Sequence, residues 1–332
     1  GARGRPPVAL DVVPDARHVI GIKLSDERHT AVLADFAGAT VAEATLPTPP
    51  ARRSLGQVLD DTAALVGQLT AQAPERAVAA VGVGLSGLVD HLSGRVAWSP
   101  LLLDEDVDIK AALEARLGLP VHADNDSNVL TLAELWFGAG RAVSDFVVVT
   151  IENGVGMGVV LGSQPFRGTG GMGLELGHTK VHLDGALCRC GQRGCLEAYL
   201  ADYALAREAA TALGRNPRTA QSPHGMLDTL FEEAKAGSEV ARAIFSRAGR
   251  YLAVGLANVV QLFDPELVIL SGERMRFHFL YADEVLAEMH ALTLPRGRPP
   301  VRVEVHAWGD LVWAQGAVAL ALGAVTDEAL GG

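Results

Sequence analysis

HVIGIKLSDERHTAVLADFAG, residues 18–38, places two short apolar runs around a polar turn, and FVVVTIENGVGMGVVL, residues 146–161, repeats that plan around a Gly-rich turn. Apolar runs of this length bounded by turn residues predict β-strands. A strand-turn-strand unit that occurs twice predicts a chain built from two α/β halves, the second beginning near residue 126, with a cleft between them.

The segments around these two stretches predict a regular succession of helices and strands. AVAAVGVGLSGLVD (77–90) is a buried strand that runs into a Gly-rich turn, so the early order is β-β-α-β. A helix is predicted over 55–73. Residues 120–140 predict a short strand, a turn at Asp124–Asp126 and a helix. The later elements are a long helix over 237–264, the buried strand LVIL (267–270) and a closing helix over 312–323.

The composition is that of a globular protein, and its charge disfavours a DNA-binding surface on this chain. The 332 residues exceed one ordinary core and suit two domains or one large α/β unit. A formal net charge of −11 disfavours phosphate contacts, which need clustered Lys and Arg. Any contact with DNA would therefore need a part outside this sequence.

The chain carries no apolar run of about 18 residues, the length that spans a membrane. Its start, GARGRPPVAL, lacks the apolar core of a signal peptide, so we expect a cytoplasmic protein. The start also lacks Met and is rich in Gly, Arg and Pro, which is typical of a linker.

All three cysteines lie in CRCGQRGCLE, residues 188–197. An odd number of cysteines this close together does not make a disulfide framework, so we expect reduced thiols. Three thiolates, Cys188, Cys190 and Cys195, with the imidazole of His178 form the donor set of a closed structural zinc site. The alternative is three thiols with no metal. A closed site leaves no open position for catalysis, so zinc would fix the loop and the ring of His178, whose other nitrogen would face the cleft.

LELGH (174–178) followed by CRCGQRGCLE resembles the signature of the ROK family, named after repressors, open reading frames and kinases. The resemblance implies an actin-like fold of two ribonuclease-H-like α/β domains that bind a sugar in the cleft. The smaller domain would comprise 13–125 with 312–332, and the larger 126–311, with the zinc loop and an oligomerisation surface. Further segments carry the resemblance: GVGLSGLVD and GRVAWSP (82–100), ADNDSN (123–128), TIENGVGMGVVLG (150–162), FDPELVILSG (263–272) and AQGAVALAL (314–322).

By this similarity six residues would contact the sugar: Gly87 (through its backbone), Asn125, Asp126, Glu175, His178 and Glu197. Carboxylates, an amide and an imidazole supply the paired donors and acceptors that sugar hydroxyls need. In the kinases of the family, the residue matching Asp126 is the general base. Alternatively, Asp124–Asp126 cap a helix and the two glutamates are solvated. The sugar site is favoured because the zinc loop ties Glu197 to His178.

Kinases of this fold hold ATP with Gly-rich turns, because backbone N–H groups must approach the phosphates. Here Lys23 stands at the position of an Asp, and no glycine follows it. Glu152 places a carboxylate where a phosphate would lie, a repulsion of about 1 to 4 kcal/mol. The third turn, residues 270–273, lacks one of the family's paired glycines. This pattern predicts sugar binding without a functional ATP/Mg²⁺ site.

Gly4-Arg5-Pro6-Pro7 resembles the junction that follows the winged helix-turn-helix domain in the family's regulators, or is an ordinary Pro-rich tail. Residues 1–12 are thus interpreted as a linker from a missing DNA-binding domain. The chain would be the effector part of a ROK-type transcriptional regulator of the xylose or N-acetylglucosamine repressor type, controlling carbohydrate metabolism as a homodimer or homotetramer. The alternatives are an ATP-dependent sugar kinase, with Asp126 catalytic, and a zinc-stapled scaffold that binds no sugar.

Two positions depart from the family pattern. Leu101 stands where members often carry a sugar-binding Asn, and Ser86 stands where a Pro is common before Gly87. The loss of the Asn predicts an effector other than glucose, or a degenerate pocket.

Overall fold

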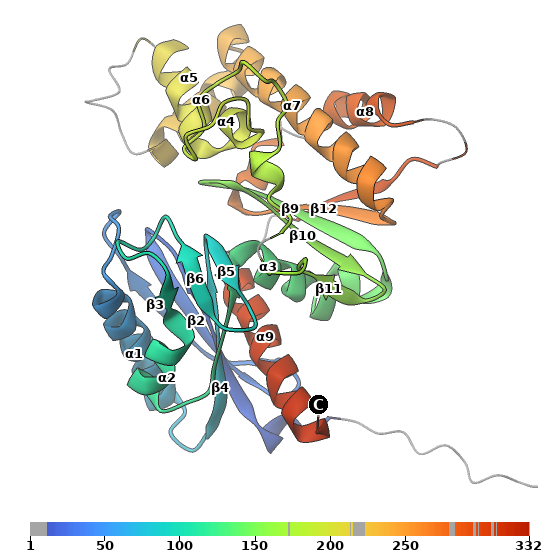
Figure 1. Ribbon diagram of the computed structural model, residues 1–332. Helices are drawn as coiled ribbons and strands as arrows, with labels where there is room; N and C mark the ends of the chain where they lie inside the picture. The colour runs from blue at the N-terminus through green and yellow to red at the C-terminus, as the bar shows by residue number, and fades with distance from the viewer. Residues whose placement is uncertain are drawn as a thin grey trace, which may run out of the picture. The chain divides into compact units, whose positions relative to one another are not determined.

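The computed structural model describes residues 12–171, 173–212, 214, 223–278, 283–294, 297, 299–306, 309 and 311–331. The chain forms two compact units, the first comprising Gly1–Val129 with Leu311–Gly332 and the second Leu130–Asp310 (Figure 1). Each unit holds a five-stranded sheet with helices, so the predicted α/β class is confirmed. The predicted linker, including Gly4–Pro7, lies outside the described residues apart from Val12.

The sheet of the first unit has the order β3-β2-β1-β4-β8. Strand β1 is antiparallel to β2 but parallel to β4, and β4 is parallel to β8. The carboxyl ends of β1, β4 and β8 therefore lie at one edge. The strands are β1 (His18–Leu24), β2 (Arg28–Asp35), β3 (Thr40–Pro47), β4 (Val78–Leu85) and β8 (Val121–Asn125), and a small second sheet holds β5 (Leu88–Asp90), β6 (Arg95–Trp98) and β7 (Val107–Asp108).

Helices α1 (Leu55–Gln72), α2 (Ile109–Leu117) and α9 (Leu311–Leu330) pack in the first unit. Ser54 starts α1 with a capping box, in which its hydroxyl and the side chain of Gln57 satisfy each other's backbone N–H groups. Helix α9 touches the sheet directly, because a Cβ on Gly21 or Gly82 would lie 2.0 or 1.9 Å from a carbonyl oxygen of α9. Figure 1 shows α9 in red across the blue strands.

The sheet of the second unit has the order β11-β10-β9-β12-β13. Buried residues of its strands and helices form a large apolar core, in which Leu196 packs against Gly255 of α7. The strands are β9 (Phe146–Ile151), β10 (Val155–Leu161), β11 (Gln164–Phe166), β12 (Leu267–Ser271) and β13 (Arg302–His306), and the helices are α4 (Glu197–Leu200), α5 (Asp202–Ala212), α6 (Pro223–Lys235), α7 (Glu239–Phe263) and α8 (Asp283–Leu292). Helix α3 (Asp126–Trp136) contains the boundary between the units.

Both strand-turn-strand predictions are confirmed by β1–β2 and β9–β10. The early order β-β-α-β is wrong, because the edge strand β3 precedes α1. The predicted turn at Asp124–Asp126 is also wrong: β8 continues to Asn125 and α3 begins at Asp126, since local side-chain hydrogen bonds let the strand run straight into the helix. Helix α9 extends beyond the predicted end, to Leu330.

Within the described part of the chain, no helix combines the length and the apolar character that crossing a membrane would require.

Candidate functional site

Three of the six predicted sugar residues meet in the first unit, at the carboxyl ends of β4 and β8. The amide of Asn125 donates to the carbonyl of Gly87 at 2.8 Å, and the Ser86 hydroxyl donates to Oδ2 of Asp126 at 2.5 Å. Gly87 has φ +127°, and a Cβ there would lie 2.2 Å from the carbonyl oxygen of Trp98. Only glycine therefore lets the backbone pass this point.

The capping alternative describes part of this geometry. The Ser127 N–H donates to Oδ1 of Asn125 at 2.8 Å and to Oδ1 of Asp126 at 2.9 Å, so these residues do hold the start of α3. Asp124, fully buried, accepts from the amide of Asn128 at 2.8 Å. A carboxylate accepts several hydrogen bonds, so Asp126 keeps acceptor capacity for a ligand.

Leu101, at which the sequence departs from the family pattern, lies in the interior of the first unit. The Leu101 side chain is buried in the apolar core of the first unit, and its N–H donates to the Ser99 hydroxyl at 3.2 Å. That hydroxyl in turn donates to the Ser86 carbonyl at 2.6 Å. Hydrogen bonds through the Ser99 hydroxyl thus join Leu101 to Ser86, beside Gly87.

The other three predicted sugar residues are Glu175, His178 and Glu197 of the second unit. The segments that carry them contact the start of β10. Gly177, in the Leu176–His178 turn, packs on Val155, because a Cβ there would lie 2.3 Å from the Val155 carbonyl oxygen. The N–H of Val155 donates to Oε2 of Glu197 at 3.4 Å. Glu197 is 8% exposed, so the alternative that it is a solvated loop residue is wrong. Glu175 lies 4.0 Å from Nε2 of His178, carboxylate to imidazole.

His178, Cys188, Cys190 and Cys195 form one cluster, with their four ligand atoms within 4.8 Å of one another. Sγ of Cys190 and Sγ of Cys195 are 3.7 Å apart, as are Sγ of Cys188 and Nδ1 of His178. With Zn–S bonds of about 2.3 Å, a tetrahedral zinc ion places two thiolates about 3.8 Å apart. The donor set and its spacing therefore fit this ion, and all three cysteines are free of disulfides.

Two residues that sequence reasoning missed contact this cluster. The Lys180 ammonium donates to Sγ of Cys195 at 2.9 Å, which raises the pKa of Lys180. The Tyr203 hydroxyl donates to Sγ of Cys188 at 3.5 Å and to Oε1 of Glu197 at 3.4 Å. Burial, together with these partners, raises the pKa of Tyr203, and burial raises the pKa of the Cys188 thiol.

The turns that the family resemblance compares with nucleotide-binding turns make contacts with side chains of this chain. In the first unit, the Lys23 ammonium lies 3.6 Å from the centroid of the Trp313 ring, on α9. In the second unit, Glu152 lies beside Gly272 of the third turn, since a Cβ there would be 3.3 Å from Oε1 of Glu152.

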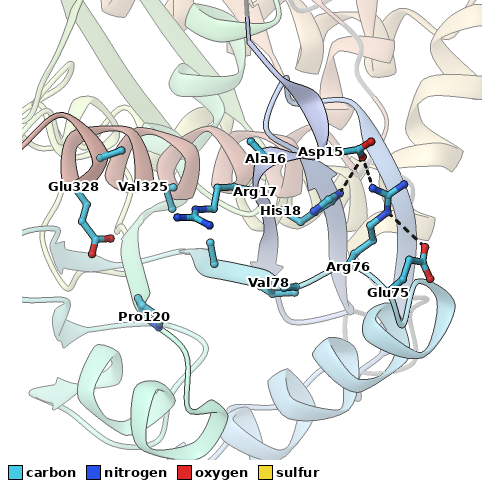
Figure 2. A pocket seen from close by; sticks show the side chains of 13 residues that line it. Asp15, Ala16, Arg17, His18, Glu75, Arg76, Val78, Pro120, Val325 and Glu328 are labelled. Atoms are coloured by element: carbon cyan, nitrogen blue, oxygen red, sulfur yellow. Dashed lines mark hydrogen bonds and ion pairs between the residues drawn. The ribbon is translucent and has the colours of Figure 1, made fainter.

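A cavity of about 650 Å³ lies in the first unit, near the amino ends of β1 and β4 (Figure 2). Arg76 pairs there with Asp15 and Glu75, and Arg17 points into the cavity. None of the residues predicted to bind sugar or metal lines it.

The sequence matches the ROK family over residues 19–324. The xylose repressor of Caldicellulosiruptor bescii is 27% identical over 328 residues, covering 96% of this chain and 82% of the repressor. A ROK family glucokinase from Streptomyces griseus, solved with glucose and AMPPNP, superposes with a TM-score of 0.78 at 30% identity, covering 92% of this chain and 99% of the kinase. A ROK family transcriptional regulator homologous to the E. coli MLC protein superposes with a TM-score of 0.83 at 23% identity, covering 100% of this chain and 85% of the regulator, and thereby supports the fold. The chain has the actin-like fold of these proteins and belongs to the ROK family.

Proposed function

We propose that this chain is the sugar-sensing effector part of a ROK-type transcriptional regulator, with a structural zinc ion and no functional ATP site. The residues proposed to bind a sugar or sugar derivative are Gly87, Asn125, Asp126, Glu175, His178 and Glu197. The effector would then favour one of two conformations of the regulator.

The observation that carries the proposal is the contact between Lys23 and Trp313. Lys23 is the second-to-last residue of β1 and stands where the kinases carry an acidic residue, and its ammonium lies against the ring of Trp313, which is 2% exposed. Mg²⁺ takes oxygen ligands, which an ammonium cannot supply. Because phosphoryl transfer depends on the placement of phosphates and Mg²⁺, this substitution argues for binding without catalysis.

Glu152 supports the same conclusion from the second unit. Its carboxylate lies beside Gly272, so one anionic side chain reaches both turns that would approach the nucleotide. The Glu152 carbonyl also accepts from the N–H of Asp202 at 3.0 Å, which fixes the turn against the start of α5. A nucleotide phosphate at this turn would meet a negative charge rather than open backbone N–H groups.

Zinc would be held by His178, Cys188, Cys190 and Cys195. When bound, a closed four-ligand ion supplies rigidity and no reaction step. The protein's own part is to orient the His178 ring: Nδ1 faces the thiols, and Nε2 faces the Glu175 carboxylate at 4.0 Å. The ring would thus present a fixed tautomer to a sugar hydroxyl.

The remaining features of the proposal derive from family resemblance. DNA would be contacted through a winged helix-turn-helix domain that precedes this chain, and the protein would act in the cytoplasm as a homodimer or homotetramer. The xylose repressor that aligns with 96% of this chain supports the regulatory role.

The second candidate function is an ATP-dependent sugar kinase with atypical nucleotide turns. The observation that favours it is the Asp126 carboxylate, held by Ser86 at the start of α3 as a general base must be held. The structural similarity to the Streptomyces griseus glucokinase supports it as well.

Incubation with Mg-ATP and a panel of hexoses, pentoses and amino sugars separates the two functions. We expect calorimetry to detect binding of one sugar class, weakened in Asp126→Asn, and no ADP formation. ADP formed with any sugar, and lost in Asp126→Asn but not in the exposed control Asp327→Asn, would establish the kinase. Zinc-replete protein that binds no sugar or sugar phosphate would instead favour the scaffold.

A further inference from the structure

The backbone sets Lys180 opposite Cys195. The two residues form an antiparallel bridge, flanked by hydrogen bonds from the Val181 N–H to the Gly194 carbonyl at 2.9 Å and from the Leu196 N–H to the Thr179 carbonyl at 3.0 Å. Side chains directly opposite each other in such a pair lie on the same face. The contact of Lys180 with the sulfur therefore follows from backbone register and not from a chance rotamer.

The Lys180 ammonium has two acceptors, both belonging to candidate metal ligands. It donates to Sγ of Cys195 at 2.9 Å and to the backbone carbonyl of His178 at 3.2 Å. Cys195 and His178 are 17 residues apart in the sequence, so the cluster brings together two separate segments of the chain. The Lys180 ammonium thus links the Leu176–His178 turn to Cys195, the last cysteine of the 188–197 segment.

The charge of the site calls for such a cation. A zinc ion with three thiolates and a neutral imidazole carries a net charge of −1. Two carboxylates add to it, because Oε2 of Glu175 lies 4.0 Å from Nε2 of His178 and Oε1 of Glu197 lies 3.5 Å from Sγ of Cys188. Tyr203 contributes only a neutral donor on the Cys188 side.

We propose that Lys180 is an outer-shell positioning residue of the zinc site, which neutralises the thiolate charge and slows loss of the metal. A thiolate that accepts a charge-assisted hydrogen bond is less available to a proton or an electrophile, so its bond to the metal is attacked less readily. The inference rests on zinc binding and is independent of sugar binding.

The test compares wild-type protein with Lys180→Met, which keeps the length of the side chain but removes the donor, and with Lys180→Arg, which restores a donor. Lys235→Met is the matched control, because Lys235 is also an exposed lysine of the second unit, and its ammonium pairs with Glu232 and lies 5.4 Å from the Phe231 ring, away from the metal cluster. Zinc content is measured first, and then the rate of zinc transfer to a chelating dye.

We expect one zinc per chain in the wild type and zinc transfer about 10- to 100-fold faster in Lys180→Met, the usual effect of removing an outer-shell partner. Lys180→Arg should fall between these two proteins, and Lys235→Met should match the wild type. After Co²⁺ substitution, the thiolate-to-cobalt charge-transfer absorption of Lys180→Met should move to longer wavelength, because the sulfur lone pair loses its hydrogen bond.

Equal transfer rates and equal Co²⁺ spectra in the wild type and Lys180→Met would overturn the proposal, as would wild-type protein that holds no zinc. An unfolded Lys180→Met protein would not be mistaken for support, because the Co²⁺ spectrum requires the assembled site. Failure to bind sugar with these zinc results intact would overturn the proposed function alone.

Discussion

The Tyr203 hydroxyl lies between Oε1 of Glu197, at 3.4 Å, and Sγ of Cys188, at 3.5 Å. One phenol of α5 thus touches both a predicted sugar contact and a predicted metal ligand. Arg189 stacks on the same ring at 4.1 Å and restrains it from the loop side. Through Tyr203, the metal cluster and Glu197, a predicted sugar contact, share a hydrogen-bond network.

Tyr203→Phe should weaken sugar binding while leaving zinc in place. The buried Glu197 carboxylate loses a donor, a loss of about 1 kcal/mol or roughly fivefold in Kd. Calorimetry with the sugar and metal analysis of the same sample measure both effects. Tyr251→Phe is the control, since its ring stacks on Tyr199 in the same unit. Loss of zinc together with sugar would show that Tyr203 supports the whole loop instead.

Cys190→Ser should lose zinc and sugar binding together. The variant keeps three of the four ligands, and the loop that fixes His178 and Glu197 loosens. Thermal unfolding with and without a chelator checks this, because a metal present at about 1,000 times its Kd stabilises the fold by about 4 kcal/mol. The wild-type Tm should fall on chelation, whereas that of Cys190→Ser should not change. A chelator-sensitive Cys190→Ser protein would contradict the four-ligand site.

Gly87→Ala should abolish sugar binding and destabilise the first unit. Gly87 has φ +127°, and its Cβ would meet the Trp98 carbonyl at 2.2 Å. Gly118→Ala is the matched control, because Gly118 also has a positive φ, +67°, but nothing lies within 4 Å of its Cβ. We expect about 1 kcal/mol of destabilisation for Gly118→Ala, from backbone strain alone, and more for Gly87→Ala. Denaturant titration gives both values, and equal losses would contradict the steric argument.

His29 should make the protein less stable as the pH falls. Burial lowers the pKa of His29 to about 4, opposed by Asp61 and assisted by Arg53. Nδ1 accepts from the Ser25 N–H at 3.1 Å, and Nε2 lies 3.6 Å from the Asp61 carboxylate. Because the unfolded chain binds the proton more tightly, this contribution is complete above pH 6.5 and is lost as the pH falls towards 4, by about 3 kcal/mol.

His29→Gln, which can still accept from Ser25, should remove that part of the pH dependence. Urea titrations at pH 7, 5.5 and 4.5 measure it. His122, whose pKa burial also lowers, remains in both proteins and contributes equally to each. A pH dependence of His29→Gln as steep as that of the wild type would contradict the prediction.

The sequence predicted the elements whose apolar runs are long or continuous, such as β1, β9 and α7. Strand β3 was not predicted, because it is an edge strand with alternating buried and exposed residues and few large apolar side chains. The metal cluster could be predicted because its thiols are neighbours in the chain. Lys180 and Tyr203 could not, because their contacts depend on a backbone bridge and on the direction of α5.

The seating of α9 on Gly21 and Gly82 constrains the order in which a newly made chain can fold. Strands β1 and β4 leave the ribosome early, whereas the helix that covers them consists of residues 311–330. The second unit, which lies between them in the sequence, is complete before that helix is made. During synthesis the first unit therefore cannot complete its packing, because one apolar face of its sheet stays uncovered until α9 is made. The second unit can fold before that. A chain truncated after residue 310 should thus contain a folded second unit and an unfinished first one.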